Sequence, residues 1–391
     1  MVEGSFNVTY WVLFLCDSLH DFYMKNISIL LPNLRGGGAE RLAIYLANDW
    51  VARGFAVEFV LMQEEGELVP LVSPQISIVS LQAKRIKWSI LPFYRYLRRT
   101  QPDVIWVGMW PLTSAAIIAW VGAGKPGRLY ITDHNQLSVS CIQELEVWPV
   151  YLKLLMRATY PFATGVMAVS QGVKEDMCRL GGFTDERVKV IYNPAATGVC
   201  PDRESVKVRE QLWGAGFSHH ILTVGSFKVQ KNHALLIRAF AKLPRSLNAK
   251  LVILGEGTLR PQLEALISEL NLQGLVSLPG FTTDPYPWFR SADLFVLSSG
   301  WEGLPTVLIE ALECGLPIVS TDCPSGPAEI LVNGRFGKLV PVGDVDALAA
   351  AMEASLNESY DRQALMNRAK DFSVERISEQ YLDYFGLNHH A

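Results

Sequence analysis

The 391-residue sequence has little charge and no grouped cysteines. Only 19% of its residues are charged and 49% are hydrophobic, which excludes a disordered, collagen-like or coiled-coil chain. Its six cysteines lie far apart, with no CxxC pair and no histidine cluster nearby. The sequence therefore indicates neither a disulfide scaffold nor a zinc site, and a reducing compartment fits best. The net charge of −4 excludes a basic nucleic-acid-binding protein, so we expect no nucleic-acid partner.

The sequence also lacks a clear export signal or membrane span. The apolar run at 10–16 is short and no Lys or Arg precedes it, whereas a signal peptide begins with basic residues. The uncharged run at 104–124 reaches membrane-spanning length, but its Gly, Pro, Ser and Thr residues divide it into a strand and a helix. A true span is the alternative. We predict a cytoplasmic protein, and we hypothesise that translation begins at Met24 and that residues 1–23 are dispensable.

Strand-like and helix-like segments alternate from Asn26 onward. Short β-branched runs such as ISILL and AVEFVLM are separated by amphipathic segments of helix length, which predicts parallel βαβ units. The alternation pauses at 193–203, where Pro, Gly and small residues gather, and then resumes. We predict an α/β fold of two facing Rossmann-like domains, 24–195 and 196–370, with a closing helix in 371–391 that crosses back to the first domain. Ligands of such sheets bind at the carboxyl ends of the strands, so the chemistry is expected in the cleft between the domains.

Two loops at predicted strand ends carry candidate anion-binding residues. Gly36, Gly37 and Gly38 precede a helix, where they allow close approach of a ligand to the backbone and to the helix N-terminus. A purely structural glycine turn is an equally good interpretation. Lys228 and Lys231 follow a strand at the mouth of another helix and suit a pyrophosphate. Two solvated lysines are the alternative.

Two glutamates of the segment 298–331, Glu302 and Glu310, are candidate functional residues. Glu302 lies in the loop after a predicted strand, Pro305 is expected at the first position of the following helix, and Glu310 lies one and a half turns into it. An ionised Glu310 on this largely apolar helix is costly unless it accepts hydrogen bonds, and a vicinal diol supplies two donors. An exposed helix glutamate is the alternative.

These segments together resemble the retaining family-4 glycosyltransferases of the GT-B fold, from Asn26 to Gly386. The family's glutamate pair matches Glu302 and Glu310. The GGGAER loop, the pair His134–Asn135, and the segments QKNHALLIRAF, GEG, PGF and CPSGPAEI match as well. The resemblance implies transfer of a hexose or N-acetylhexosamine from a nucleotide-sugar, usually a UDP-sugar, with retained configuration and with no metal or other cofactor. It also implies a glycan or lipid-linked acceptor of cell-surface polysaccharide or glycolipid assembly.

The resemblance also assigns roles to individual residues. Glu302 would meet the donor sugar, Lys231 would neutralise the diphosphate, and His134 would lie beside the donor sugar or the acceptor. Glu310 would hold the ribose hydroxyls. The other expected donor-binding residues are Gly303, Leu304, Thr306, Gly225, Ser226, Lys228, Phe281 and Gly255, and the glycines 36–38 would approach the reacting centre. Ser226 stands where the family commonly has Arg, and we hypothesise that Lys228 takes over that charge.

Two charged segments lie outside these motifs. Asp344 and Asp346 form a DVD sequence before a helix, and we interpret them as a helix cap and a dipole partner rather than a metal site. Residues 84–99 contain six basic side chains, four aromatics and no acid. This pattern favours contact of Arg95, Arg98 and Arg99 with an anionic membrane, and an ordinary basic helix face is the alternative.

Three other functions are compatible with such a chain. A nucleotide-sugar epimerase of the same fold would isomerise the donor without an acceptor. A non-catalytic nucleotide- or sugar-binding protein is disfavoured by the intact glutamate pair. A dehydrogenase is disfavoured because the chain has no GxGxxG fingerprint at the first strand-to-helix turn. The sequence does not predict the oligomeric state.

Overall fold

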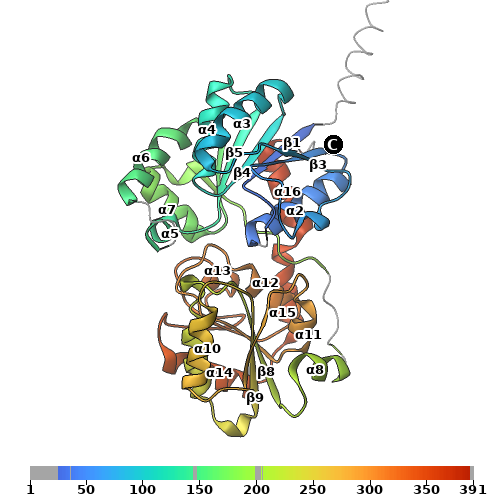
Figure 1. The fold of residues 1–391 in the computed structure, drawn as a ribbon, viewed down its shortest axis with the longest axis vertical. Coiled ribbons are helices and arrows are strands. Elements are labelled where there is room, and N and C mark those ends of the chain that lie inside the picture. Colours follow the sequence, from blue (N-terminus) through green and yellow to red (C-terminus); the bar gives the residue numbers. More distant parts are fainter. Residues whose placement is uncertain (1–24, 36, 144–147, 199–203, 205, 388–391) are drawn as a thin grey trace, which may run out of the picture.

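The structure is a computed structural model that describes residues 25–387 apart from 36, 144–147, 199–203 and 205. The predicted extension at 1–23 lies outside the described residues. Two parallel sheets face one another, one in each half of the chain (Figure 1). The prediction of two Rossmann-like α/β domains is confirmed.

The first domain is built on a seven-stranded sheet of order β3-β2-β1-β4-β5-β6-β7. Its inner strand β1 is buried except at its first residue, because helices cover both faces of the sheet. The strands are β1 (Asn26–Leu31), β2 (Ala56–Leu61), β3 (Ser77–Ser80), β4 (Val104–Gly108), β5 (Arg128–Asp133), β6 (Gly165–Ala168) and β7 (Val188–Val190). The helices are α2 (Gly38–Ala52), α3 (Ile86–Thr100), α4 (Leu112–Gly122), α5 (Leu137–Gln143), α6 (Pro149–Thr159) and α7 (Gln171–Gly181).

The second domain is built on a six-stranded sheet of order β10-β9-β8-β11-β12-β13. The strands are β8 (His219–Val224), β9 (Ala249–Leu254), β10 (Val276–Gly280), β11 (Leu294–Leu297), β12 (Ile318–Thr321) and β13 (Lys338–Val340). The helices are α8 (Val206–Trp213), the short η4 (Val229–Lys231), α9 (His233–Ala241), α10 (Arg260–Glu269), α11 (Tyr286–Ser291), α12 (Thr306–Glu313), α13 (Pro327–Ile330), α14 (Val345–Asn357) and α15 (Arg362–Ala369).

The last helix, α16 (Val374–Phe385), lies beside α2 in the first domain (Figure 1). Its buried residues recur at helical spacing and present aromatic rings to the domain core. Phe385 lies 5.7 Å from Trp50 between ring centroids, and Tyr381 lies 5.1 Å from Trp106. The C-terminal helix therefore belongs to the core of the first domain.

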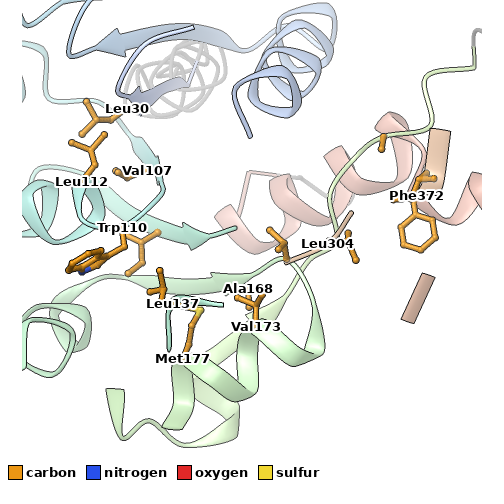
Figure 2. Close-up of a cluster of buried hydrophobic side chains, with 14 of the residues drawn as sticks. Leu30, Val107, Trp110, Leu112, Leu137, Ala168, Val173, Met177, Leu304 and Phe372 are labelled. Carbon is orange, nitrogen blue, oxygen red and sulfur yellow. The ribbon is translucent and has the colours of Figure 1, made fainter. Parts of the chain in front are cut away.

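A second buried cluster crosses the boundary between the domains. Leu304, from the second domain, lies in the same cluster as Ala168 and Val173 of the first (Figure 2). Because Leu304 follows directly after Gly303, the packing of this leucine fixes the loop that precedes α12 against the first domain.

The segment 104–124 forms the buried strand β4 and the helix α4, so the prediction of a strand and a helix is confirmed. No helix among the described residues has both the length and the apolar character needed to cross a membrane. Of the described cysteines, Cys141, Cys178 and Cys323 are free thiols and Cys314 is disulfide-bonded. The wide spacing of the cysteines gave no indication of that bond.

Candidate active site

The strands of the two sheets point their carboxyl ends toward each other. The loops that follow these strands are in contact across the boundary between the two domains. The backbone at Gly303 lies so close to the first domain that a Cβ there would be 1.9 Å from the carbonyl oxygen of His134. Ser325 donates its hydroxyl to the carbonyl of Gly303 (2.8 Å), and the same hydroxyl lies 2.6 Å from that of Ser170. The loops before α7, α12 and α13 therefore form one continuous contact between the domains.

Glu302 and Lys231 form a buried ion pair at the centre of this contact. Lys231 Nζ lies 2.6 Å from Glu302 Oε1, and the hydroxyl of Ser299 donates to the same oxygen at 2.6 Å. Glu302 is only 4% exposed. A carboxylate this buried requires a paired cation and hydrogen bonds, and both are present. The structure thus brings together two of the three predicted catalytic side chains.

Backbone hydrogen bonds fix the loop 225–231, which carries Lys231. Gly225 donates to Leu254 (2.9 Å), Phe227 donates to Glu256 (2.8 Å), and Gly300 donates to Gln230 (2.8 Å). Gly255 has φ +147°, and a Cβ there would lie 2.0 Å from the carbonyl oxygen of Gly225, so only glycine fits. Gly255 therefore allows the loops 225–231 and 255–257 to pack directly against each other.

The helix α12 begins at Thr306, one residue later than the sequence predicts. Pro305 is therefore its N-cap and not its first residue. No side chain caps this helix, and the first amides of a helix have no intrahelical acceptor. Its N-terminus follows Glu302, Gly303 and Leu304 directly. This end of α12 therefore combines free backbone donors and a positive dipole end with the Lys231 ammonium, which suits an anion.

Glu310 lies on α12 beside side chains from the first domain. Burial raises the pKa of its carboxyl to about 7, and the positive charge of Arg41 opposes that rise. Arg41 belongs to α2 and also donates to the carbonyl of Thr283 at 3.1 Å. Thr283 follows Phe281, the residue that the resemblance places beside the base, and Phe281 is 48% exposed. Arg41 therefore links the first domain to the expected nucleoside end of the site.

Arg41 is a candidate functional residue that the sequence reasoning missed. The signal was available, because a cation close to the first turn of a helix is disfavoured by the helix dipole and therefore calls for a partner elsewhere. Glu313 was missed as well. It accepts from the amide of Gly198 (2.6 Å) and from the hydroxyl of Tyr286 (2.9 Å), so it ties α12 to the segment between the domains.

His134 lies against the other side of the contact, at the end of β5. Burial lowers the pKa of its imidazole to about 4, so the ring is neutral at pH 7. Its Nδ1 is buried and has no hydrogen-bond partner among the described residues. The neighbouring Asp133 accepts from the amide of Trp110 (3.1 Å) and the hydroxyl of Tyr160 (2.8 Å), and these bonds fix the strand end that carries His134.

The remaining predicted residues lie at the rim of the contact. Gly37 is the N-cap of α2 and Gly38 its first residue, and both are exposed, while Gly36 is outside the described residues. Lys228 is exposed. Its positive charge favours the ionised form of Glu40 on α2, although burial raises the pKa of that carboxyl overall. Ser226 accepts from the amide of Lys228 through its carbonyl (2.8 Å) and is partly buried.

Asp344 caps α14 by accepting from the amide of Ala347 at 2.9 Å, so the prediction of a helix cap at Asp344 is confirmed. Asp346 pairs with Lys242 on the surface. Among the described residues, no group of three or more His, Cys, Asp or Glu side chains is arranged to hold a metal ion.

Both halves of the chain match glycosyltransferase families. Residues 36–198 match the model of Glycosyltransferase Family 4, and residues 217–372 match that of Glycosyl transferases group 1. In Campylobacter jejuni, a 4-alpha-N-acetylgalactosaminyltransferase named for an N-acetylgalactosamine-N,N'-diacetylbacillosaminyl-diphospho-undecaprenol substrate is 32% identical over 92% of this chain and 99% of its own. The lipopolysaccharide core biosynthesis glycosyltransferase LpsE of Rhizobium meliloti is 27% identical over 89% of this chain and 95% of its own.

Solved structures show the same fold. HepE of Anabaena in complex with UDP covers 93% of this chain and 100% of its own, with a TM-score of 0.74 and 20% identity. The lipopolysaccharide outer core galactosyltransferase WaaB covers 93% of this chain and 99% of its own, with a TM-score of 0.70 and 20% identity. With the full-length match at 32% identity, these findings show that the chain is a glycosyltransferase of GT-B fold and belongs to glycosyltransferase family 4.

Proposed function

We propose that this glycosyltransferase moves a hexose or N-acetylhexosamine from a UDP-sugar to a lipid-linked glycan, with retention of configuration and without a metal ion. The observation that carries the proposal is the buried Lys231–Glu302 pair beside the uncapped start of α12, opposite His134. The Campylobacter relative is named for a diphospho-undecaprenol-linked glycan, and the Anabaena neighbour was solved with UDP. Both support the substrates proposed for this chain.

The reaction would rest on charge stabilisation. As the bond between the anomeric carbon and the diphosphate breaks, negative charge develops on the phosphate oxygens. The Lys231 ammonium and the first amides of α12 are fixed where such an anion would lie, so no reorganisation is needed when the charge appears. Glu302 pairs with Lys231 through Oε1. Its Oε2 would accept a hydrogen bond from a hydroxyl of the donor sugar. No covalent nucleophile is required.

Glu310 would bind the ribose by accepting hydrogen bonds from its two hydroxyls. A carboxylate whose pKa is about 7 is only partly ionised at neutral pH, and two donated hydrogen bonds favour the ionised form. The charge of Arg41 acts in the same direction. Contact of Gly303 with His134 closes the cleft on the donor and reduces access of water, which limits hydrolysis of the sugar nucleotide.

The acceptor would approach from the first domain at a membrane surface. Arg95, Arg98 and Arg99 are exposed on α3, a helix without any acidic residue. Anionic lipid headgroups suit this surface, and a lipid-linked acceptor would be anchored there. We propose that the enzyme works as a peripheral protein on such a membrane.

A transfer assay tests the proposal. Purified enzyme is incubated with a set of UDP-sugars and a lipid-linked glycan extract, with and without EDTA, and UDP release is measured together with the glycosylated lipid. We expect UDP release that depends on acceptor and persists in EDTA. Lys231→Ala should reduce turnover at least 100-fold, whereas Lys242→Ala, on the exposed end of α9, should not. Isomerised donor without acceptor would instead favour the epimerase, and loss of activity in EDTA would contradict the metal-free mechanism.

A further inference from the structure

Exposed apolar side chains gather on one face of the first domain. Among the residues that the structure describes, ten of the fifteen exposed large hydrophobic side chains lie between residues 88 and 162. Most belong to α3, α4 and α6. They include Trp88 (65% exposed), Trp148 (81%), Val150 (65%), Tyr151 (58%) and Leu154 (64%). Scattered exposed hydrophobic residues are ordinary, but this concentration on one part of the surface is a feature that marks an interaction site.

The three helices lie side by side, so their exposed faces form one surface. The helix α4 packs against α3 on one side and α6 on the other. On α4 the exposed residues are Ile118, Val121 and Gly122, at helical spacing. On α6 they include Val150, Tyr151, Leu154 and Arg157, again on one stripe.

The exposed stripe of α3 divides into an apolar and a basic half. Trp88 and Leu91 lie in the first two turns, followed on the same side by Arg95, Arg98 and Arg99. Lys153 and Arg157 add positive charge on α6. Within their described bounds α3, α4 and α6 contain no Asp or Glu, in a chain whose net charge is −4. An apolar surface whose helices carry positive and no negative charge within these bounds complements an anionic bilayer better than it complements a typical protein surface.

We propose that the exposed faces of α3, α4 and α6 form a single membrane-docking surface, in which the apolar stripe of α6 enters the interface of an anionic bilayer. The basic residues of α3 and α6 contact the headgroups around it. The proposed surface is larger than the arginines of α3, because the apolar side chains that enter the bilayer belong to α6. The choice of a membrane as the occupant rests on the lipid-linked acceptor of the proposed function.

The orientation fits an enzyme whose acceptor sugar is attached to a membrane lipid. Helices that follow parallel strands begin at the carboxyl ends of those strands, which is the edge that faces the second domain. Trp88 lies in the first turn of α3 and Trp148 caps the start of α6, so both tryptophans lie toward the cleft. Tryptophan is the side chain that favours the boundary between lipid and water. The surface therefore meets the bilayer next to the cleft, where a lipid-linked sugar has a short path to the donor.

Vesicle sedimentation tests this surface. The full-length protein is mixed with vesicles of phosphatidylcholine, or of equal parts phosphatidylcholine and phosphatidylglycerol, and the bound fraction is measured at low and high salt. We expect binding to the anionic vesicles. The double variant Tyr151→Ser/Leu154→Ser should bind at least tenfold more weakly at both salt concentrations, because each substitution removes apolar area from the lipid. The variant Arg95→Ala/Arg98→Ala/Arg99→Ala should lose mainly the part of the vesicle binding that high salt also removes.

A matched control separates position from hydrophobicity. Leu71→Ser/Val342→Ser removes two exposed apolar side chains that lie outside the three helices, and it should bind vesicles like the wild type. Unchanged binding of the α6 variant would overturn the proposal. A second result would also overturn it: the wild type is a dimer by light scattering and binds no vesicles, and the α6 substitutions convert it to a monomer. UDP-induced stabilisation is measured on every variant, so a failure of the proposed function appears as loss of that signal in the wild type, independently of the vesicle result.

Discussion

The contact between Gly303 and His134 makes a sharp prediction about domain closure. In Gly303→Ala the added methyl would lie 1.9 Å from the carbonyl oxygen of His134, whereas ordinary contacts begin at 3.4 Å. The two backbones must therefore separate by about 1.5 Å. Because the two segments belong to different domains, the strain falls on the boundary, where Leu304 packs against the first domain, and not on the separate clusters within each domain.

The expected effect is on catalysis rather than on folding. A displacement of about 1 Å between catalytic groups costs on the order of 100-fold in rate. We expect Gly303→Ala to lower turnover by about that factor in the transfer assay. Because the added methyl faces His134 rather than Glu310, UDP affinity should change less than about threefold, or about 0.6 kcal/mol. The melting temperature should move by less than about 4 °C.

Gly300→Ala is the matched control, because the nearest atom to a Cβ there is the Gln230 carbonyl oxygen at 3.9 Å. It should keep wild-type turnover. If Gly303→Ala retained full turnover, the close contact with His134 would have no part in the active arrangement. If instead it lowered the melting temperature strongly, the loop would serve the fold of the second domain rather than its closure on the first.

Further predictions concern individual side chains. UDP affinity should fall up to about tenfold per pH unit as pH drops below about 7, because the raised pKa of Glu310 leaves less carboxylate for the ribose, and calorimetry on Glu310→Gln should show no such dependence. The same burial disfavours the ionised carboxylate in the folded state, so Glu310→Gln should stabilise the unliganded protein at pH 8 and not at pH 4. Arg41→Ala should move the midpoint of the UDP pH profile upward, since a cation that favours ionised Glu310 is lost, and Arg53→Ala at the far end of α2 should not move it. Lys228→Ala should reduce donor turnover, and an unchanged rate would refute its replacement of the family arginine. Glu329→Ala should cost about 1 kcal/mol in urea unfolding, because its carboxylate accepts from the amides of Gln171 and Gly172 at the start of α7, whereas the exposed Glu175→Ala should cost less.

The sequence predicted the architecture well because strand and helix periodicities are local properties. Each β-branched run and each amphipathic segment carries its own signal, and parallel strands place the following loops at one edge. Glu302 and Lys231 could be found for the same reason, because both follow a predicted strand. Their direct pairing at 2.6 Å could not, since it depends on the placement of two loops 71 residues apart.

The features that sequence reasoning missed depend on contacts between distant elements. The place of Arg41 near the start of α2 indicates that it needs a partner, but not that its charge acts on Glu310 of the other domain, because that depends on how the two domains meet. The apolar stripe of α6 was missed for a different reason. Apolar residues at helical spacing predict a buried face, and periodicity alone does not reveal that Tyr151 and Leu154 remain exposed while Leu152 and Met156 face the core.

Nucleotide binding tests the central claim most directly. Thermal unfolding is measured with UDP, GDP, ADP and NAD, on the wild type and on Glu310→Ala. A ligand at about 100 times its dissociation constant adds about 2.7 kcal/mol to a protein that binds it only when folded. The account predicts a rise in melting temperature that is selective for UDP and absent in Glu310→Ala. A response to NAD, or equal stabilisation of Glu310→Ala by UDP, would contradict it.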